Sequence, residues 1–121
     1  LLETTGASIQ LYDEDQLNAI TALSGSGPAY IFYFMNAMIQ RGIEYGFSLT
    51  EASKIVEQTF LGAVELYKVN NFTCDEWISK VSSKGGTTEA AIKHFNENTV
   101  SLHIQEGLDK ALNRSRELSQ K

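Results

Sequence analysis

The sequence predicts an all-α domain of about six helices. Apolar residues recur at helical spacing from Asp13 onward, and breaks rich in Gly, Ser or Asn divide the periodic stretches. Ser, Thr or Asp residues, whose side chains accept hydrogen bonds from free helix amides, stand just before several of these stretches. Only residues 7–12 alternate apolar and polar side chains, as in a short strand or an extended segment.

Capping residues mark the first two helices. Asp13 is predicted to cap a short helix, with Gln16 as its capping-box partner, that carries on one face Leu17, Ile20 and Leu23. The stretch Ser24-Gly25-Ser26-Gly27 is predicted to break this helix. Pro28 suits the first position of the next helix, because its φ is already helical and its missing N–H is not needed there. That second helix is predicted to reach Gly46.

The start of the second helix, residues 29–35, is apolar on every side. Such a helix needs neighbours all round, and a chain of 121 residues can hardly supply them. We therefore predict an intertwined dimer in which the second subunit covers what the first cannot. The alternative is a central helix enclosed wholly by its own domain.

The third and fourth helices follow from further capping residues. Thr50 is predicted to cap the third helix, which ends near Asn70-Asn71. Thr73 and Glu76 form a capping box for a short helix over residues 74–81, whose inner side carries Trp77 and Val81.

Two more helices complete the domain. Thr87-Thr88-Glu89 opens the fifth, which runs through Phe95. The last helix follows residues 96–98, and its apolar stripe consists of Val100, Ile104, Leu108, Ala111, Leu112, Ser115 and Leu118.

Composition narrows the classes of partner. Hydrophobic residues make up 42% of the chain, enough for a core, and the net charge is −5 with a pI near 4.9. Basic residues are scattered, Arg114 and Arg116 being the nearest to a cluster, which argues against nucleic acid and anionic membranes. No apolar run approaches the roughly 20 residues of a membrane span. Protein or small-molecule partners are expected.

A single cysteine and the start of the chain bear on location and domains. Cys74 has no second cysteine to pair with, so we expect a cytoplasmic protein in which Cys74 is an inert residue in the first turn of a helix. Residues 1–6 resemble the end of a helix with Gly6 at its C-cap, and no signal-peptide pattern is visible. We expect residues 1–12 to continue from a preceding domain and residues 13–121 to form one helical domain.

The stretch from Val81 to Ala91 carries the clearest chemical signal. Gly85 and Gly86 stand immediately before a helix start, where glycine permits left-handed backbone and close approach of a ligand to free amides. The positive end of the helix and the hydroxyls of Ser83, Thr87 and Thr88 favour an anion such as a carboxylate or phosphate. The alternative is an ordinary interhelical turn in which Thr87 caps the helix.

The sequence supports neither a phosphate-binding loop nor a metal site elsewhere in the chain. The segment Gly25-Ser26-Gly27 lacks the third glycine and the preceding strand of a dinucleotide fingerprint, so we reject a phosphate loop there. His94 and His103 fall on different predicted helices without further ligands at metal-binding spacing, so no metal site is predicted.

Two blocks together resemble one enzyme family. Ser24-Gly25-Ser26-Gly27-Pro28-Ala29-Tyr30 and, about fifty residues later, Val81-Ser82-Ser83-Lys84-Gly85-Gly86-Thr87-Thr88 are similar to the pyrroline-5-carboxylate reductases. The resemblance covers nearly the whole chain. It implies a helical C-terminal domain like that of 6-phosphogluconate dehydrogenase, which pairs as an intertwined homodimer and often assembles into rings. It also implies a missing N-terminal dinucleotide-binding domain, with residues 1–12 as its remnant or link.

The resemblance further implies an activity and a site. Family members reduce 1-pyrroline-5-carboxylate to L-proline, the last step of proline biosynthesis, with NADPH or NADH. Ser83, Gly85 and the Gly86, Thr87 and Thr88 backbone would hold the substrate carboxylate, with the Thr88 hydroxyl near the ring nitrogen as a positioning group and proton donor. Gly25 and Ser26 would lie next to the cofactor. This chain alone would be inactive.

The sequence departs from the family pattern at two places and leaves two other functions open. Lys84 stands where proline is common, and Asn71 followed by Phe72-Thr73-Cys74 replaces an acidic residue and a His-Pro pair. A non-catalytic dimerisation module would fit the same helices, and a reductase of another small imino or keto acid would fit the same carboxylate loop.

Overall fold

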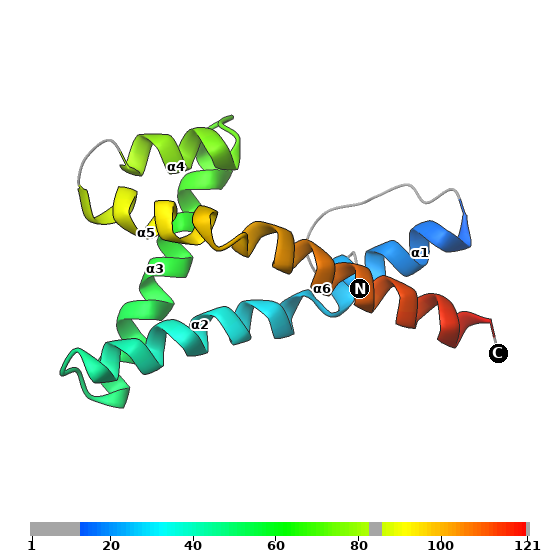
Figure 1. Cartoon of the computed structure of the whole chain (residues 1–121), viewed down its shortest axis with the longest axis horizontal. Coiled ribbons are helices and arrows are strands. Elements are labelled where there is room, and N and C mark those ends of the chain that lie inside the picture. The colour runs from blue at the N-terminus through cyan, green and yellow to red at the C-terminus, as the bar shows by residue number, and fades with distance from the viewer. Residues whose placement is uncertain (1–12, 83–85, 121) are drawn as a thin grey trace. The chain divides into compact units, whose positions relative to one another are not determined.

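The computed structural model describes residues 13–82 and 86–120, and all regular structure in them is helical. The elements are α1 (Glu14–Ile20), a single π-helical turn η2 (Thr21–Gly25), α2 (Gly27–Glu44), α3 (Leu49–Val69), α4 (Cys74–Ser82), α5 (Gly86–Glu97) and α6 (Val100–Ser119) (Figure 1). The all-α prediction is confirmed. The expectations for residues 1–12, including the extended segment and Gly6, lie outside the described residues.

The chain divides into two compact units. The described part of the first unit comprises residues 13–31 and 100–120, so it holds α1, η2, the first turn of α2 and α6. The second unit, Phe32–Thr99, holds the rest of α2 with α3, α4 and α5.

In the first unit, α6 packs against α1 and η2, and side-chain hydrogen bonds join α6 to α1. Asn18 on α1 is 9% exposed; its Oδ1 accepts from the Ser115 hydroxyl at 2.7 Å, and its Nδ2 donates to Ser119 Oγ at 3.4 Å. Arg116 donates from Nε and Nη2 to the two carboxylate oxygens of Asp15 at 2.7 and 2.8 Å. Because each bond needs one particular pairing of residues, this network fixes how α1 lies along α6.

Capping residues set the helix starts, largely as predicted. The Gln16 N–H donates to Asp13 Oδ1 at 2.8 Å, and the Thr73–Glu76 capping box is complete. The third helix differs, because Ser48 rather than Thr50 is its cap. Ser48 Oγ accepts from the Glu51 N–H at 3.1 Å, and Glu51 Oε1 accepts from the Ser48 N–H at 2.8 Å, so the reciprocal box starts the helix two residues earlier.

The predicted break at residues 24–27 is shorter in the structure, where Ser26 alone forms a bend between η2 and α2. Helical winding continues through η2, where the Ser26 N–H donates to the Thr21 carbonyl five residues earlier at 2.8 Å, and α2 begins directly afterwards at Gly27. Serine and glycine lower helix propensity, but side-chain hydroxyls that satisfy local carbonyls allow helical winding to continue as far as Gly25. Thr21 Oγ1 donates to the Leu17 carbonyl at 3.0 Å and Ser24 Oγ to the Ile20 carbonyl at 3.1 Å.

Small residues bring α2 and α3 together in the second unit. A Cβ built on Gly42 would lie 3.1 Å from the Cβ of Ala52, which is 1% exposed. Further along the two helices, the rings of Phe34 and Phe60 meet edge to face with centroids 6.3 Å apart. Glycine at 42 thus allows a close approach that any side chain would obstruct.

Positive φ angles mark two of the helix ends. Gly46, at φ +107°, follows α2 and lets the chain turn toward Ser48. Thr99, at φ +52°, joins α5 to α6, and its N–H donates to the Asn96 carbonyl at 3.2 Å. A β-branched residue is rare in this conformation, so the corner at Thr99 is strained.

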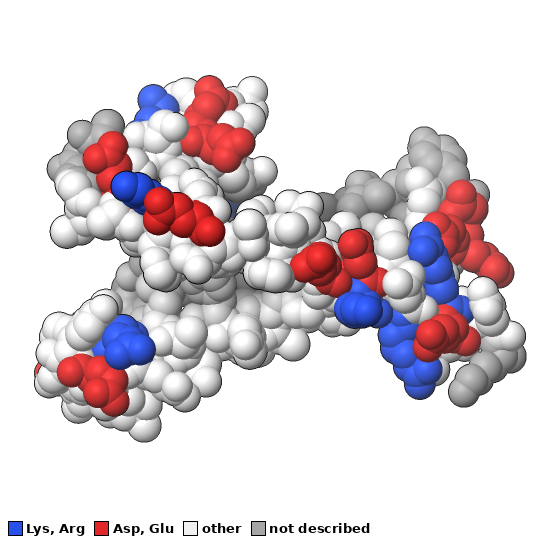
Figure 2. Space-filling view, viewed as in Figure 1, with Lys and Arg blue, Asp and Glu red and all other residues white. Residues whose placement is uncertain are grey.

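The apolar core of a single chain is small. Among the described residues, the buried apolar side chains are Ala22, Ala52 and Val56, whereas Phe32 and Tyr33 are 66% and 82% exposed. No residue of α2, which is described over its full length, is buried, so the alternative of a central helix enclosed by its own domain is wrong. Most of α2 is white in Figure 2, because its charged residues stand near its C-terminal end. A single chain therefore leaves most of its large apolar side chains in water.

None of the described helices has both the length and the apolar character that crossing a bilayer requires.

We predict that Ser48→Ala lowers the free energy of unfolding by about 0.5–2 kcal/mol, because the first turn of α3 loses its cap. Thr50→Ala is the matched control, since Thr50 lies within that turn and its side chain makes no hydrogen bond to another described residue. Urea denaturation at one fixed protein concentration measures both. Equal losses of unfolding free energy in the two variants would contradict the assignment of the cap to Ser48.

The same capping box predicts a pH dependence. The hydrogen bond from the Ser48 N–H holds the pKa of the Glu51 carboxyl below its ordinary value. The box is therefore at full strength above about pH 4.3 and weakens as the pH falls through the lowered pKa of the folded state. Glu51→Gln keeps an acceptor but cannot titrate, so its unfolding free energy should fall less steeply on acidification. Denaturation curves that stay parallel down to about pH 3 would contradict this.

Candidate functional site

The first turn of α5 is the centre of the candidate site. The helix begins at Gly86, so the amides at the start of its first turn have no partner within the helix. Gly86 and Thr87 are exposed, and Thr88 is half-buried. Free amides and the positive end of a twelve-residue helix together make this turn suited to an anion.

Two of the predicted site residues lie outside the described residues. Ser83 and Gly85 belong to the segment 83–85 between α4 and α5, so the structure places neither of them. The structure does place the residues on both sides of that segment, Ser82 at the end of α4 and Gly86 at the start of α5, in the lining of the same groove.

Gly86 corrects one expectation. It is the first residue of α5 and does not have the positive φ that was expected of it, and a Cβ at this position would meet no atom within 4 Å. Thr87 is the second residue of the helix, so it is not the cap of the interhelical-turn alternative. Neither a positive φ nor a neighbouring atom of the described chain therefore requires a glycine at position 86.

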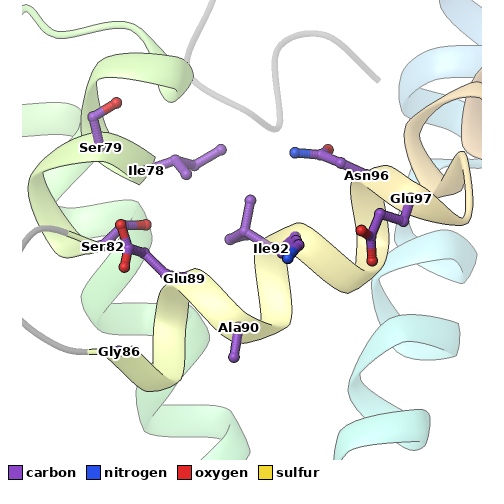
Figure 3. Close-up of a pocket in the computed structure, with 10 residues that line it drawn as sticks. Ile78, Ser79, Ser82, Gly86, Glu89, Ala90, Ile92, Asn96 and Glu97 are labelled. Carbon is purple, nitrogen blue, oxygen red and sulfur yellow. The ribbon is translucent and has the colours of Figure 1, made fainter.

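A groove of about 710 Å³ lies between α4 and α5 (Figure 3). Ile78 from α4 and Ile92 from α5 point toward one another across it, and polar side chains line its sides. Its lining consists of Ile78, Ser79, Ser82, Gly86, Glu89, Ala90, Ile92, Lys93, Asn96 and Glu97. Thr88 flanks this face of α5 without lining the groove.

Ser82 is a polar residue that the sequence did not single out as part of the site. Its hydroxyl oxygen is buried and has no hydrogen-bond partner among the described residues, as is also true of Trp77 Nε1. An unsatisfied buried hydroxyl costs about 1–3 kcal/mol, so Ser82 would gain from a polar guest beside Gly86. Its position directly before Ser83 was the available signal. Glu89 also lines the groove, and its charge disfavours an anion on that side.

Gly25 and Ser26 lie in the other unit, at the end of η2 and just after it. Both precede α2 and follow a π-helical turn, whereas a dinucleotide fingerprint follows a strand. The segment at Gly25 and Ser26 therefore lacks the strand–loop–helix arrangement of a dinucleotide fingerprint.

The remaining candidates are placed on the surface. His94 is in α5 and His103 in α6, where His103 Nδ1 lies 3.0 Å from Glu106 Oε1. Cys74 is exposed and is the first residue of α4, as expected. Within residues 13–82 and 86–120, no group of three or more His, Cys, Asp or Glu side chains could hold a metal ion. Beside Cys74, Phe72 packs edge to face on Trp77 with centroids 5.4 Å apart.

The similarity to known proteins extends over both units of the chain. Residues 14–118 match the model of the pyrroline-5-carboxylate reductase dimerisation family. The pyrroline-5-carboxylate reductase of Pseudomonas aeruginosa is 42% identical over 120 residues, which are 99% of this chain and 44% of the relative. That of Aquifex aeolicus is 35% identical over 106 residues, 88% of this chain and 40% of the relative. The chain thus spans less than half the length of these curated relatives.

Solved structures give the same fold. A pyrroline-5-carboxylate reductase from Coxiella burnetii superposes with a TM-score of 0.85 at 38% identity, covering 91% of this chain and 41% of that one. The Plasmodium falciparum pyrroline carboxylate reductase with NADP bound superposes with a TM-score of 0.82 at 27% identity, covering 88% and 41%. With residues 14–118 matched from α1 to the end of α6, the chain belongs to the pyrroline-5-carboxylate reductase dimerisation family.

Proposed function

We propose that this chain is the C-terminal part of a pyrroline-5-carboxylate reductase, which reduces 1-pyrroline-5-carboxylate to L-proline with NADPH or NADH as the final step of proline biosynthesis. The observation that carries the proposal is that the family match, over residues 14–118, includes both η2 and the start of α5. The names of the relatives, and the NADP bound to the Plasmodium falciparum protein, support the reaction and its cofactor.

The proposed site for the substrate carboxylate is the first turn of α5. Backbone amides of Gly86, Thr87 and Thr88 hold the carboxylate there, joined by Ser83 and Gly85 from the preceding segment. The helix end contributes about 0.3–2 kcal/mol and each neutral hydrogen bond about 1 kcal/mol. Binding at a millimolar constant takes about 4 kcal/mol, so several of these contacts must act together.

Thr88 is proposed to place the ring of the substrate. Its hydroxyl lies near the ring nitrogen and donates or relays a proton, while the nicotinamide supplies the hydride when bound. A threonine hydroxyl is a weak acid, so a substrate that arrives already protonated at nitrogen suits this site. This domain would then contribute to catalysis by orienting the reacting carbon of the substrate.

The cofactor phosphates are proposed to bind to a preceding dinucleotide-binding domain, of which residues 1–12 are the remnant or link. The lack of a phosphate loop in the described residues supports this division, and it also means that the chain alone should lack reductase activity. Gly25 and Ser26 are proposed to lie next to the cofactor. We expect the enzyme in the cytoplasm, in keeping with a single exposed cysteine.

Two chains are proposed to form an intertwined homodimer, and dimers to assemble further into rings. The exposure of Phe32 and Tyr33, together with an α2 that buries no residue in its own chain, supports pairing. Obligate interfaces are apolar enough to resemble a core cut in half, which is what the uncovered face of α2 offers.

The open alternatives differ in what they predict for the loop. A non-catalytic dimerisation module needs the helices but not Thr88, and a reductase of another imino or keto acid needs the same carboxylate site with a different ring preference. Steady-state kinetics with 1-pyrroline-5-carboxylate and with other small imino and keto acids separates all three.

We predict that the chain sediments as a dimer at micromolar concentration. Phe32→Glu places a charge on the uncovered face of α2 and should abolish pairing together with most of the helical circular dichroism, because a single chain has little core of its own. Gln40→Glu, on the same helix outside the apolar stretch, is the control. A well-folded monomer of the parent chain would contradict the dimer.

We predict that Thr88→Ala in a full-length reductase carrying this chain lowers kcat/KM by about 2-fold to 150-fold, the range for losing one hydrogen bond to a neutral or charged group. Cofactor affinity should change little. Gly86→Val should be more severe, since its side chain has open space in the fold but would occupy the place of the ligand. Thr50→Ala makes the same chemical change as Thr88→Ala away from the loop. If the Thr88 and Gly86 variants match the parent, residues 83–88 are an ordinary interhelical turn.

A further inference from the structure

The Ala22 carbonyl, in the π-helical turn η2, accepts a hydrogen bond from a side chain. The Tyr30 hydroxyl, from the first turn of α2, donates to the Ala22 carbonyl at 3.0 Å. Ala22 is 4% exposed, so water has little access to that residue. The bond spans eight residues and closes across η2 from outside the turn.

The same carbonyl is the acceptor that ordinary α-helical winding would use. In an α-helix the Ser26 N–H would donate four residues back, to Ala22, whereas in η2 it donates five residues back, to Thr21, at 2.8 Å. The wider winding is the rarer one and needs local support. The Tyr30 hydroxyl already satisfies one of the two lone pairs of the Ala22 carbonyl, so the α-helical alternative gains less from that acceptor.

A change of winding would not stay local. One residue of α-helix turns the chain by about 100°, so a slip in η2 would rotate Ser26 and the first turn of α2 relative to α1. The α1 helix cannot follow freely, because the bidentate Arg116–Asp15 pair and the Ser115–Asn18 bond hold it on α6. The segment after η2 would therefore take up the rotation.

The geometry points to Tyr30 as a positioning residue that locks η2 in its π-helical winding and thereby sets the direction of Ser26. Thr21 and Ser24 donate their hydroxyls back to main-chain carbonyls of α1, whereas the Ser26 hydroxyl makes no hydrogen bond to another described residue. Standing between Gly25 and Gly27, it is available to a ligand. This inference rests on the proposed function, in which Ser26 lies next to the nicotinamide cofactor.

The test compares Tyr30→Phe with Tyr45→Phe in a full-length reductase carrying this chain. Both remove only a hydroxyl, and that of Tyr45, a residue 75% exposed, makes no hydrogen bond within the described part of the chain. Hydrogen exchange of peptides spanning residues 21–31 should become faster in Tyr30→Phe and stay at the parent rate in Tyr45→Phe. Unchanged exchange in Tyr30→Phe would overturn the lock.

Kinetics then ask whether the lock acts through Ser26. Tyr30→Phe and Ser26→Ala should each raise the KM for the cofactor by about 2-fold to 12-fold, with a smaller change in kcat. Adding Tyr30→Phe to Ser26→Ala should raise it no further. Full additivity of the two effects would overturn positioning through Ser26. A full-length protein with no reductase activity would instead overturn the proposed function, and hydrogen exchange would still decide on the lock.

Discussion

The scarcity of core within one chain is the constraint on which the rest of the structure depends. Its buried apolar side chains in the described residues are two alanines and a valine, which cannot offset the conformational entropy lost on ordering a chain of 121 residues. Capping boxes and the polar network around Asn18 shape individual helices, but each contributes only about a kilocalorie per mole. The homodimer proposed above would cover further apolar surface between chains, and it would then make folding and pairing one process.

Local chemistry decides how much of this fold is predictable. Asp13 and the Thr73–Glu76 pair can be recognised because a cap acts within three residues, and such interactions can be read along a chain. Ser48 was missed in favour of Thr50 although Glu51 stands at capping-box distance from it. The π-helical turn could not be foreseen, because its support from Tyr30 comes from outside the turn and competes with a winding of nearly equal hydrogen bonding.

The candidate site also combines features that the sequence predicts with features that depend on packing. A glycine pair before a threonine-rich helix start indicates an anion site from sequence alone, and the structure places that helix start at Gly86. What the pattern could not predict is the backbone at Gly86, which is helical, or the buried hydroxyl of Ser82, since burial depends on α4 packing beside α5. A glycine before a helix can serve either the geometry of a turn or access for a ligand, and the sequence alone does not distinguish these two roles.

The close approach of α2 and α3 at Gly42 and Ala52 has a consequence for how this sequence can change. A methyl group added at position 42 would lie only 3.1 Å from the Ala52 Cβ, so a larger residue at either position is tolerated only if the other becomes smaller or the helices move apart. The two positions are therefore expected to show epistasis: the effect of a substitution at one has a size, and even a sign, that depends on the residue at the other. A scan that changes one site at a time would classify both as intolerant and would miss the pairs of residues that restore the contact.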